Sequence, residues 1–157
     1  MGSFASGVTV ITTRDGAGMR GMTANAFMSG SLDPPLCVIS VAKRAHMHAH
    51  LMASDLFGVN ILAADQESLS VHFAGRPVPG LRPDVDYSGV VPLLRRAAAH
   101  VSAEIAARHD CGDHTLFIGH ILSLEDGERP PLVYHAGRYA MLAQEQAGHH
   151  VPAPEFW

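Results

Sequence analysis

Short apolar runs bounded by turn residues recur along this chain, and each has the length of a β-strand. Residues 8–13 (VTVITT) are rich in β-branched side chains and end at the polar turn Arg14-Asp15-Gly16, so residues 21–27 are expected to return as their partner. Runs at 36–41 and 57–62 have the boundaries of buried strands. Further strand candidates are residues 100–107, 114–122 and 132–134, the last with a continuation near Tyr139.

Two segments predict short helices because they contain helix formers and no breaker. They are residues 45–54 and residues 65–73, where Asp65 is the expected N-cap and Leu69 and Phe73 share a face at i, i+4. Prolines and glycines predict a long loop over residues 75–89. Six or more short strands with only two short helices predict a mainly β domain that closes into an antiparallel barrel, because closure removes the exposed edges of the sheet.

Length and composition indicate one folded domain. A chain of 157 residues can fold around one hydrophobic core without dividing into two domains, so residues 1–157 are expected to form a single domain. Hydrophobic residues make up 47% and charged residues 17%, which is enough apolar surface for a folded core. The 11 Lys and Arg residues are scattered and the formal net charge is -4, so the chain has no basic stripe for nucleic acid.

The cysteines and the apolar segments bear on the cellular compartment. Cys37 and Cys111 lie far apart and have no metal-binding or disulfide-framework spacing, as in proteins of a reducing compartment. The N-terminus has no basic segment followed by an apolar one, and no apolar run reaches the roughly 18 residues of a membrane span. We therefore expect a cytoplasmic protein that does not bind membranes.

The glycines at positions 16, 18 and 21 match the G-x-G-x-x-G pattern of dinucleotide-binding folds. That pattern needs a strand before it, a helix after it and an acidic residue at the distance of the ribose. Here the following residues read as strand or loop, without a βαβ unit. A glycine-rich hairpin explains the motif better.

Two pairs of neighbouring residues, each with at least one basic side chain, are candidates for ligand contact. Lys43 and Arg44 lie between a predicted strand and a predicted helix start, and cations beside a helix N-terminus suit a phosphate or another anion. A solvated basic turn is equally consistent with the sequence. Arg138 and Tyr139 either contact a planar ligand or are a surface arginine beside a partly buried tyrosine.

Histidines form the other group of candidates. His46 and His50 share a helix face, as a pair of metal ligands does, but spacing fixes no third ligand, so an interface or surface cluster is the alternative. His114 stands at a strand entrance, where it either faces a pocket or stabilises a turn. Its neighbour Asp113 does not by adjacency supply the oriented chain of a catalytic triad.

An opening segment and five later blocks carry a resemblance to a known family. The opening reads FASGVTVITT from Phe4 and GMTANAFMSGSLDPPL from Gly21. The later blocks are ISVAKRAHMHAHL from Ile39, FGVNILAADQ from Phe57, HFAG from His72, GDHTLFIGHI from Gly112 and PLVYHAGRY from Pro131. In this order they resemble the flavin reductase-like, FMN-binding split-barrel family over about residues 4–142. The resemblance implies a mainly β split barrel of Greek-key type with a few short helices.

The resemblance also implies a cofactor, a co-substrate and partners. Members of that family are homodimers that bind flavin at the barrel edge near the dimer interface, and they usually supply reduced flavin to a separate monooxygenase. For this chain the implied cofactor is FMN or FAD, with NADH or NADPH as co-substrate. The implied flavin-binding residues are Thr23, Ala24, Asn25, Ala26, Ser40, Val41, Ala42, Lys43, Arg44, Phe73, Ala74, Gly75, Arg138 and Tyr139.

By the same resemblance these residues have distinct roles. The backbone of residues 23–26 and 40–42 would hold the isoalloxazine and ribityl groups, Lys43 and Arg44 would bind the phosphate, and His114 would lie beside flavin and nicotinamide as the catalytic residue. Hydride transfer from nicotinamide C4 to flavin N5 needs two stacked rings and stabilised charge at the N1–C2 edge, and it needs no general base. No metal is implied.

Other functions are compatible with the same sequence. A protein of this fold can use FMN for electron transfer, or it can bind flavin without catalysis. A histidine-rich metal-binding module built on His46 and His50 is a third alternative.

Overall fold

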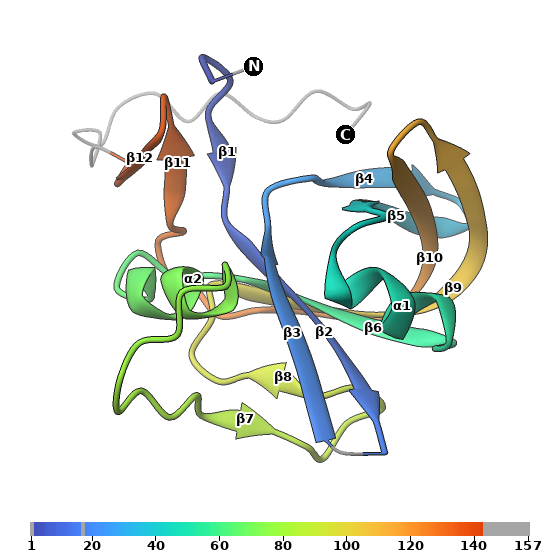
Figure 1. The fold of residues 1–157 in the computed structure, drawn as a ribbon, viewed down its shortest axis with the longest axis horizontal. Coiled ribbons are helices and arrows are strands. Elements are labelled where there is room, and N and C mark those ends of the chain that lie inside the picture. The colour runs from blue at the N-terminus through green and yellow to red at the C-terminus, as the bar shows by residue number, and fades with distance from the viewer. Residues whose placement is uncertain (1, 17, 143–157) are drawn as a thin grey trace.

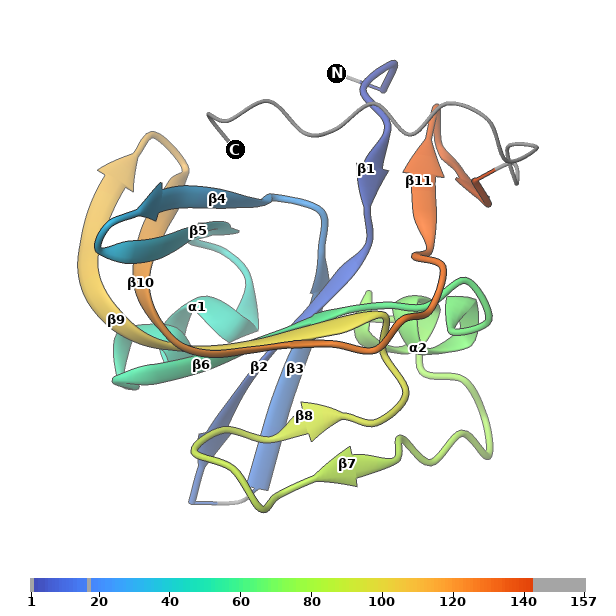
Figure 2. The same cartoon turned by 180° about the vertical axis from the view of Figure 1, so that it is seen from behind.

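The computed structural model describes residues 2–16 and 18–142, which form a mainly β domain with two short helices (Figures 1 and 2). The main strands are β2 (Thr9–Asp15), β3 (Gly18–Ala24), β4 (Phe27–Leu32), β5 (Pro35–Ala42), β6 (Leu56–Ile61), β9 (Ala99–Cys111) and β10 (His114–Asp126). They form one seven-stranded antiparallel sheet in the order β3-β2-β6-β9-β10-β5-β4. The mainly β fold predicted from the sequence is confirmed.

Smaller elements flank this sheet. The remaining elements are β1 (Ser6–Gly7), α1 (His46–Met52), α2 (Glu67–Phe73), β7 (Val85–Asp86), β8 (Leu93–Leu94), β11 (Val133–His135) and β12 (Arg138–Ala140). β1, β11 and β12 form a three-stranded sheet that stands apart from the main sheet, and β7 pairs with β8 (Figure 1).

The predicted hairpin over the glycine motif is confirmed. β2 and β3 pair from Thr9 opposite Ala24 to Asp15 opposite Gly18. Gly18 has a φ angle of 120°, a conformation that residues with a side chain rarely adopt. Gly16 and Gly18 therefore lie at the turn between two strands, Gly21 lies within β3, and none of the three opens a helix.

The long β9–β10 hairpin bends the sheet. Each strand has 13 residues, and their register shifts between Ile118 and Gly119 and again between Ile121 and Ser123. Shifts of this kind increase the local twist and bend of a strand. The bent sheet and α1 bury a core drawn from β2, β5, β6, β9, β10 and α1, in which the largest fully buried side chains are Ile11, Ile39, Leu51, Phe57 and Phe117.

The sheet curls without closing. Among the described residues, β3 and β4 are the two ends of the seven-stranded order and no pairing joins them. The expectation of a fully closed barrel is therefore wrong, whereas an open, split arrangement agrees with the structure. Helices α1 and α2 both pack against β3 and cover part of this edge, so closure is not needed to protect it (Figure 1).

Both predicted helices are present, and each begins one or two residues later than expected. Gln66, and not Asp65, occupies the N-cap of α2, and it makes no side-chain cap. The Asp65 carboxylate instead accepts a hydrogen bond from Arg129 at 2.7 Å, which lowers the pKa of Asp65. The N-cap prediction is wrong because a residue distant in sequence competes for the carboxylate.

In the described part of the chain, no helix is long and apolar enough to cross a membrane.

Four strands were not expected from the sequence. β4 exposes Met28, Ser29 and Gly30 in a row, so it lacks the alternation that marks a half-buried strand. β1, β7 and β8 are too short for periodicity to identify. The long loop predicted over residues 75–89 is interrupted only by the two residues of β7.

Replacement of Gly119 by alanine should destabilise the fold. A Cβ atom there would lie 2.5 Å from Cζ of Phe57 and 2.9 Å from Cβ of Ala103, and both of these residues are fully buried. Overpacking a rigid core costs about 1–3 kcal/mol, so urea should unfold the Gly119→Ala variant at a lower concentration than the wild type. Gly7→Ala is the control, because a Cβ there meets no atom within 4 Å. Equal midpoints for the two variants would contradict the prediction.

Candidate functional site

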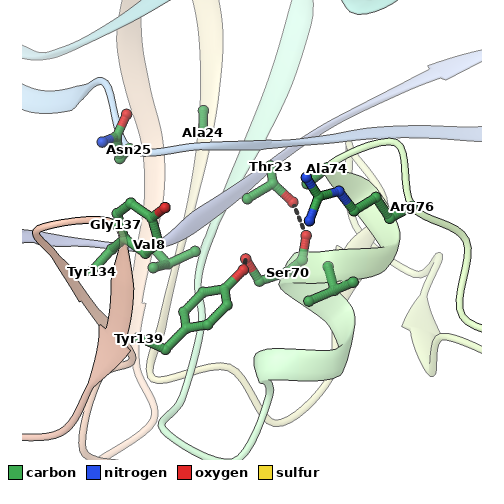
Figure 3. A pocket seen from close by; sticks show the side chains of 11 residues that line it. Val8, Thr23, Ala24, Asn25, Ser70, Ala74, Arg76, Tyr134, Gly137 and Tyr139 are labelled. Atoms are coloured by element: carbon green, nitrogen blue, oxygen red, sulfur yellow. Dashed lines mark hydrogen bonds between the residues drawn. The ribbon is translucent and has the colours of Figure 1, made fainter.

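An open cleft lies between the end of β3, helix α2 and the β11–β12 hairpin (Figure 3). Its volume is about 430 Å³, within the range of small-molecule sites. The cleft is lined by Val8, Thr23, Ala24, Asn25, Ser70, Val71, Ala74, Arg76, Tyr134, Gly137 and Tyr139.

Side-chain hydrogen bonds join the three walls of this cleft. The Thr23 hydroxyl donates to the Ser70 carbonyl oxygen at 2.7 Å, and the Ser70 and Tyr139 hydroxyl oxygens lie 2.9 Å apart (Figure 3). The rings of Tyr134 and Tyr139 meet edge to face with 5.4 Å between their centroids. These contacts fix β3, α2 and β12 relative to one another, so the cleft is largely preformed.

A tight turn places Tyr139 in the cleft wall. β11 and β12 are joined through Ala136 and Gly137, whose φ angles are 48° and 79°. Two consecutive residues with positive φ are typical of a type I′ hairpin turn, which matches the natural twist of paired strands. The HAGRY sequence therefore folds back sharply, and Tyr139 lies opposite Tyr134.

A second hollow of about 710 Å³ lies on the α1 side of β3. Thr23 and Ala74 line both hollows, so the two are adjacent, and together they are called the groove. Phe73 and Gly75 also line the second hollow. The Phe73 ring packs so closely on Gly21 that a Cβ atom at residue 21 would lie 2.7 Å from Cε1 of the ring.

β3 presents backbone hydrogen-bonding groups to this groove, because β2 is its only strand neighbour among the described residues. In an antiparallel edge strand, alternate residues point their N–H and C=O groups away from the ladder. A planar heterocycle with donors and acceptors on its rim finds complementary partners along such an edge. The aromatic side chains of Phe73 and Tyr139 add apolar contact surface. These residues fit the isoalloxazine of FMN or FAD.

The structure brings half of the predicted flavin-binding residues into this groove. They are Thr23, Ala24, Asn25, Phe73, Ala74, Gly75 and Tyr139. Arg138, which precedes Tyr139 on β12, is exposed and does not line either hollow.

The other predicted residues lie at the far end of the neighbouring strands. The Ala26 carbonyl oxygen accepts a hydrogen bond from the Ser40 N–H at 3.1 Å, which extends the β4–β5 pairing by one residue into the link between β3 and β4. Val41 is 1% exposed, so its side chain belongs to the core and only its backbone is available for contact. Ala42 ends β5 and is half-buried.

The predicted cations and His114 share one corner of the sheet. Lys43 and Arg44 are exposed in the turn after β5, and Lys43 Nζ lies 3.1 Å from an Asp110 carboxylate oxygen. His114 pairs with Ala42 in the β10–β5 ladder, and its Nδ1 lies 2.7 Å from the Asp113 carboxylate. The His114 ring lowers the pKa of Asp113 through this hydrogen bond. His114 does not line either hollow of the groove.

Sequence reasoning missed several residues that line the cleft. Ser70 and Tyr134 carry no motif of their own, and their role follows only from contacts with Thr23 and Tyr139. Arg76 is different, because a cation that directly follows the HFAG block is visible in the sequence. It adds a positive charge to the cleft wall (Figure 3).

The two histidines predicted as possible metal ligands, His46 and His50, both line the second hollow. No cluster of three or more His, Cys, Asp or Glu side chains within residues 2–16 and 18–142 is arranged to hold a metal ion.

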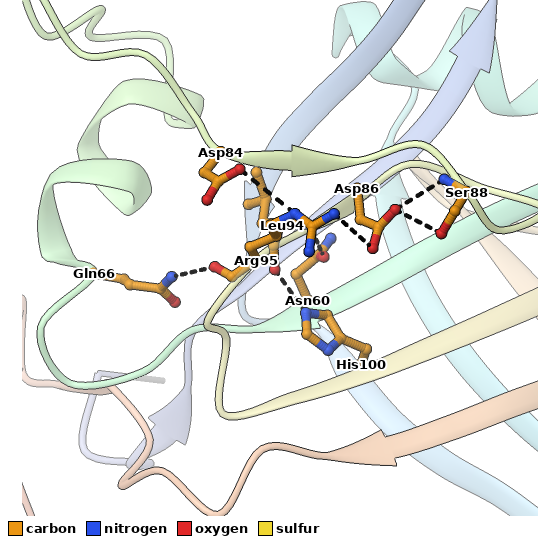
Figure 4. A network of polar contacts seen from close by, with 8 residues as sticks. All are labelled: Asn60, Gln66, Asp84, Asp86, Ser88, Leu94, Arg95 and His100. Atoms are coloured by element: carbon orange, nitrogen blue, oxygen red, sulfur yellow. Dashed lines mark hydrogen bonds and ion pairs between the residues drawn. The ribbon is translucent and has the colours of Figure 1, made fainter.

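A polar network on the β7–β8 side of the molecule is structural in character (Figure 4). The buried Asn60 side chain donates to the Val10 carbonyl oxygen and accepts from the Leu94 N–H at 2.6 Å. Arg95 forms ion pairs with Asp84 and Asp86, and the Ser88 hydroxyl and N–H lower the pKa of Asp86. These bonds hold the β7–β8 excursion against the sheet.

Comparison with known proteins matches the chain to one family. The family model described as a flavin reductase like domain matches residues 1–143. A Rhodococcus protein named NADH-dependent flavin reductase is 42% identical over 145 residues, which cover 90% of this chain and 82% of that protein. The reductase component of a Thermus thermophilus 4-hydroxyphenylacetate 3-monooxygenase is 41% identical, with 88% and 90% covered. The solved structure of the flavin reductase PheA2 in its native state has a TM-score of 0.88 and 42% identity, and the match covers 92% of this chain and 94% of that one.

The two cysteines should differ sharply in reactivity. Cys37 is fully buried in β5, and its burial raises the pKa of the thiol to about 11, whereas Cys111 is exposed at the end of β9 beside His114. The thiolate is the reactive form, so iodoacetamide at neutral pH should label Cys111 in the folded protein and spare Cys37. Peptide mass spectrometry would locate the label, and labelling in urea is the control in which both react. Labelling of Cys37 in the folded protein would contradict the burial seen here.

Proposed function

The chain belongs to the flavin reductase-like domain family, and on this premise we propose that it catalyses NAD(P)H-dependent reduction of FMN or FAD. The observation that carries the proposal is the groove along the free edge of β3, which combines backbone hydrogen-bonding groups with aromatic side chains. The relative that is 42% identical and named an NADH-dependent flavin reductase supports the same activity, with NADH as the reductant.

We propose that the groove holds the flavin ring along β3. The backbone of residues 23–26 would meet the polar rim of the ring, and Phe73 and Tyr139 would contact its surface. Flavin supplies N5 as the hydride acceptor when it is bound. Backbone N–H groups directed at the N1–C2 edge favour the reduced form, because they stabilise negative charge without having to reorganise.

Lys43 and Arg44 are the proposed site for the flavin phosphate. Both are exposed in the turn that follows β5, and the Ser40–Ala26 hydrogen bond connects this strand to the segment that follows β3. Lys43 keeps two further N–H donors beside its contact with Asp110. A phosphate with two negative charges would therefore meet two cations in one turn.

His114 is proposed to position the nicotinamide. Its hydrogen bond to Asp113 fixes the orientation of the ring, and the Lys43 N–H donates to the Asp113 carbonyl oxygen at 2.9 Å. This links His114 to the proposed phosphate turn. Since hydride transfer needs no general base, the role proposed for His114 is orientation and not proton transfer.

We further propose that the protein is a homodimer that supplies reduced flavin to a separate monooxygenase. The Thermus relative is named as the reductase component of such an enzyme. Exposed apolar side chains support an interface, and they include Met28 and Leu32 on β4 and Leu122 and Leu124 on β10. We place the activity in the cytoplasm, because both cysteines are free thiols.

Purified protein should oxidise NADH or NADPH only when FMN or FAD is present. The measurement is the loss of reduced-nicotinamide absorbance with FMN, with FAD and without flavin. Turnover with added flavin would establish the reductase and identify its preferred cofactors. Bound flavin without nicotinamide oxidation would overturn the proposal and favour an electron-transfer or non-catalytic flavin-binding protein.

The variant His114→Ala should slow hydride transfer about tenfold or more while flavin affinity changes little, because nicotinamide orientation is lost and the flavin contacts remain. Stopped-flow measurement of flavin reduction gives the rate, and fluorescence titration gives the flavin Kd. His109→Ala is the matched control, since His109 is exposed on β9 near the same end of the hairpin, opposite Leu116. Equal losses of rate and of flavin affinity in His114→Ala would refute the orientation role.

A further inference from the structure

A separate pocket lies between the main sheet and the β7–β8 excursion, around the polar network of Figure 4. Its volume is about 590 Å³, within the range of small-molecule sites. It shares no lining residue with either hollow of the groove. We call it the outer pocket, and a ligand bound there leaves the groove open.

The floor of the outer pocket is made by β9 and β10. The residues on either side of Ser102 belong to the core, so Ser102 and His100 face the other side of the sheet, where both line the pocket. On β10, Ser123 pairs with Ser102 and Glu125 pairs with His100. Directly opposite residues in an antiparallel pair lie on one face, so these four side chains form a polar patch.

The wall over this floor is apolar and held in place. Leu93 and Val91 line the pocket, and they pack so closely on β6 that a Cβ atom at Gly58 would lie 2.9 Å from Cδ2 of Leu93 and 3.1 Å from Cγ2 of Val91. The Leu94 N–H donates to the buried Asn60 side chain. The pocket is therefore bounded by fixed groups before any ligand binds.

Ser102 has an unmet hydrogen-bonding requirement in this pocket. The residue is 4% exposed, and its hydroxyl makes no hydrogen bond with any residue in 2–16 or 18–142. Buried hydroxyl groups are nearly always paired, because an unpaired one loses its hydrogen bonds to water without replacement. Since Ser102 lines the pocket, a polar group bound beside it supplies the missing partner.

The charge of the outer pocket is negative, opposite to that of the groove. Its charged lining residues are Asp84, Asp86, Arg95, Arg96 and Glu125. Arg95 pairs with both aspartates, and Arg96 lies 3.7 Å from Asp65, which does not line the pocket. Glu125 is exposed and forms no ion pair with another described residue. The pocket thus favours a cation and disfavours the phosphates of flavin and nicotinamide nucleotides.

The groups left unpaired on the floor accept hydrogen bonds. Nε2 of His100 lies 2.6 Å from the Leu94 carbonyl oxygen, which can only accept, so Nε2 carries the proton and Nδ1 of the neutral ring is an acceptor. The Glu125 carboxylate also only accepts. Ser102 and Glu125 are diagonal neighbours across the two strands, about 7–8 Å apart, so one small group can contact both.

We propose that the outer pocket binds a small organic amine. Its ammonium group would donate to Glu125 and Ser102, and its apolar part would pack against Leu93 and Leu94. An ammonium supplies both the positive charge and the N–H donors that this floor lacks. The inference goes beyond flavin reduction, because it assigns a second ligand class to a site outside the groove.

The first test compares benzylamine, benzyl alcohol and benzoate, which share a phenyl ring and carry a positive, a neutral and a negative group at neutral pH. Titration of ¹⁵N-labelled protein followed by NMR should give the lowest Kd for benzylamine and the highest for benzoate. Amide shifts should change mainly in residues 84–102 and 122–125. No benzylamine binding, tighter binding of benzoate, or shifts confined to the groove would overturn the inference.

The second test uses two variants of neighbouring carboxylates. Glu125→Gln should raise the Kd of benzylamine about threefold or more, as expected for the loss of an exposed ion pair, and leave that of benzyl alcohol unchanged. Glu104→Gln is the matched control, because Glu104 is exposed on β9 opposite His120 and does not line the pocket. Equal benzylamine affinity in the two variants would refute the role of Glu125.

The third test separates the outer pocket from the groove. Ser102→Ala should weaken benzylamine and benzyl alcohol alike, because both lose the same hydroxyl partner. Saturating FMN should leave the Kd of benzylamine unchanged in the wild type, whereas competition would place the amine in the groove and overturn the inference. None of these titrations needs turnover, so they decide the amine site even if the protein fails to oxidise NADH or NADPH.

Discussion

The free edge of β3 is the constraint on which the candidate site depends. A second strand neighbour beside β3 would consume the backbone groups that now face the groove, and the edge is left open because no pairing joins β3 to β4 among the described residues. An exposed edge is a hazard for aggregation, and here it is covered at intervals by α1 and α2. The Thr23–Ser70 hydrogen bond holds α2 at the distance that leaves a cleft between helix and strand. The same edge thus explains the position of the helices and the position of the candidate site.

Bending of the sheet is the second requirement. The register shifts at Gly119 and near Ile121 allow a long hairpin to curl, and the lack of a side chain at Gly119 admits the Phe57 ring to the core. The chain passes directly from β3 to β4, and the Ala26–Ser40 hydrogen bond extends the β4–β5 ladder into this link, so β5 lies near the end of β3. A flat sheet would leave the turn with Lys43 and Arg44 far from the groove. Core packing therefore contributes to the site, and the core residues Val8 and Met47 also line its two hollows.

The charges of the groove follow from how each cation is paired. Lys43 and Arg20 each contact a carboxylate, Asp110 and Asp15, which neutralises part of their charge and orders their side chains. Arg76 adds positive charge to the wall of the cleft. Cations at separate points around a site favour a single orientation of an anionic ligand. The chemistry of hydride transfer, which depends on the alignment of two rings, benefits from such fixed orientation.

The sequence alone determined the strands with strong alternation, both helices, the hairpin at Gly18 and, through its ordered blocks, the family. It also indicated Thr23, Phe73 and Tyr139, which lie in the groove. Tertiary structure alone decided that the sheet stays open, that Asp65 pairs with Arg129 and does not cap α2, and that Ser70 and Arg76 line the cleft. It also separated Val41, whose side chain is in the core, from its neighbours in the same block. The physical reason is that periodicity and turn chemistry act between residues close in sequence, whereas contacts such as Ser70–Tyr139 join residues that only the curl of the sheet brings together.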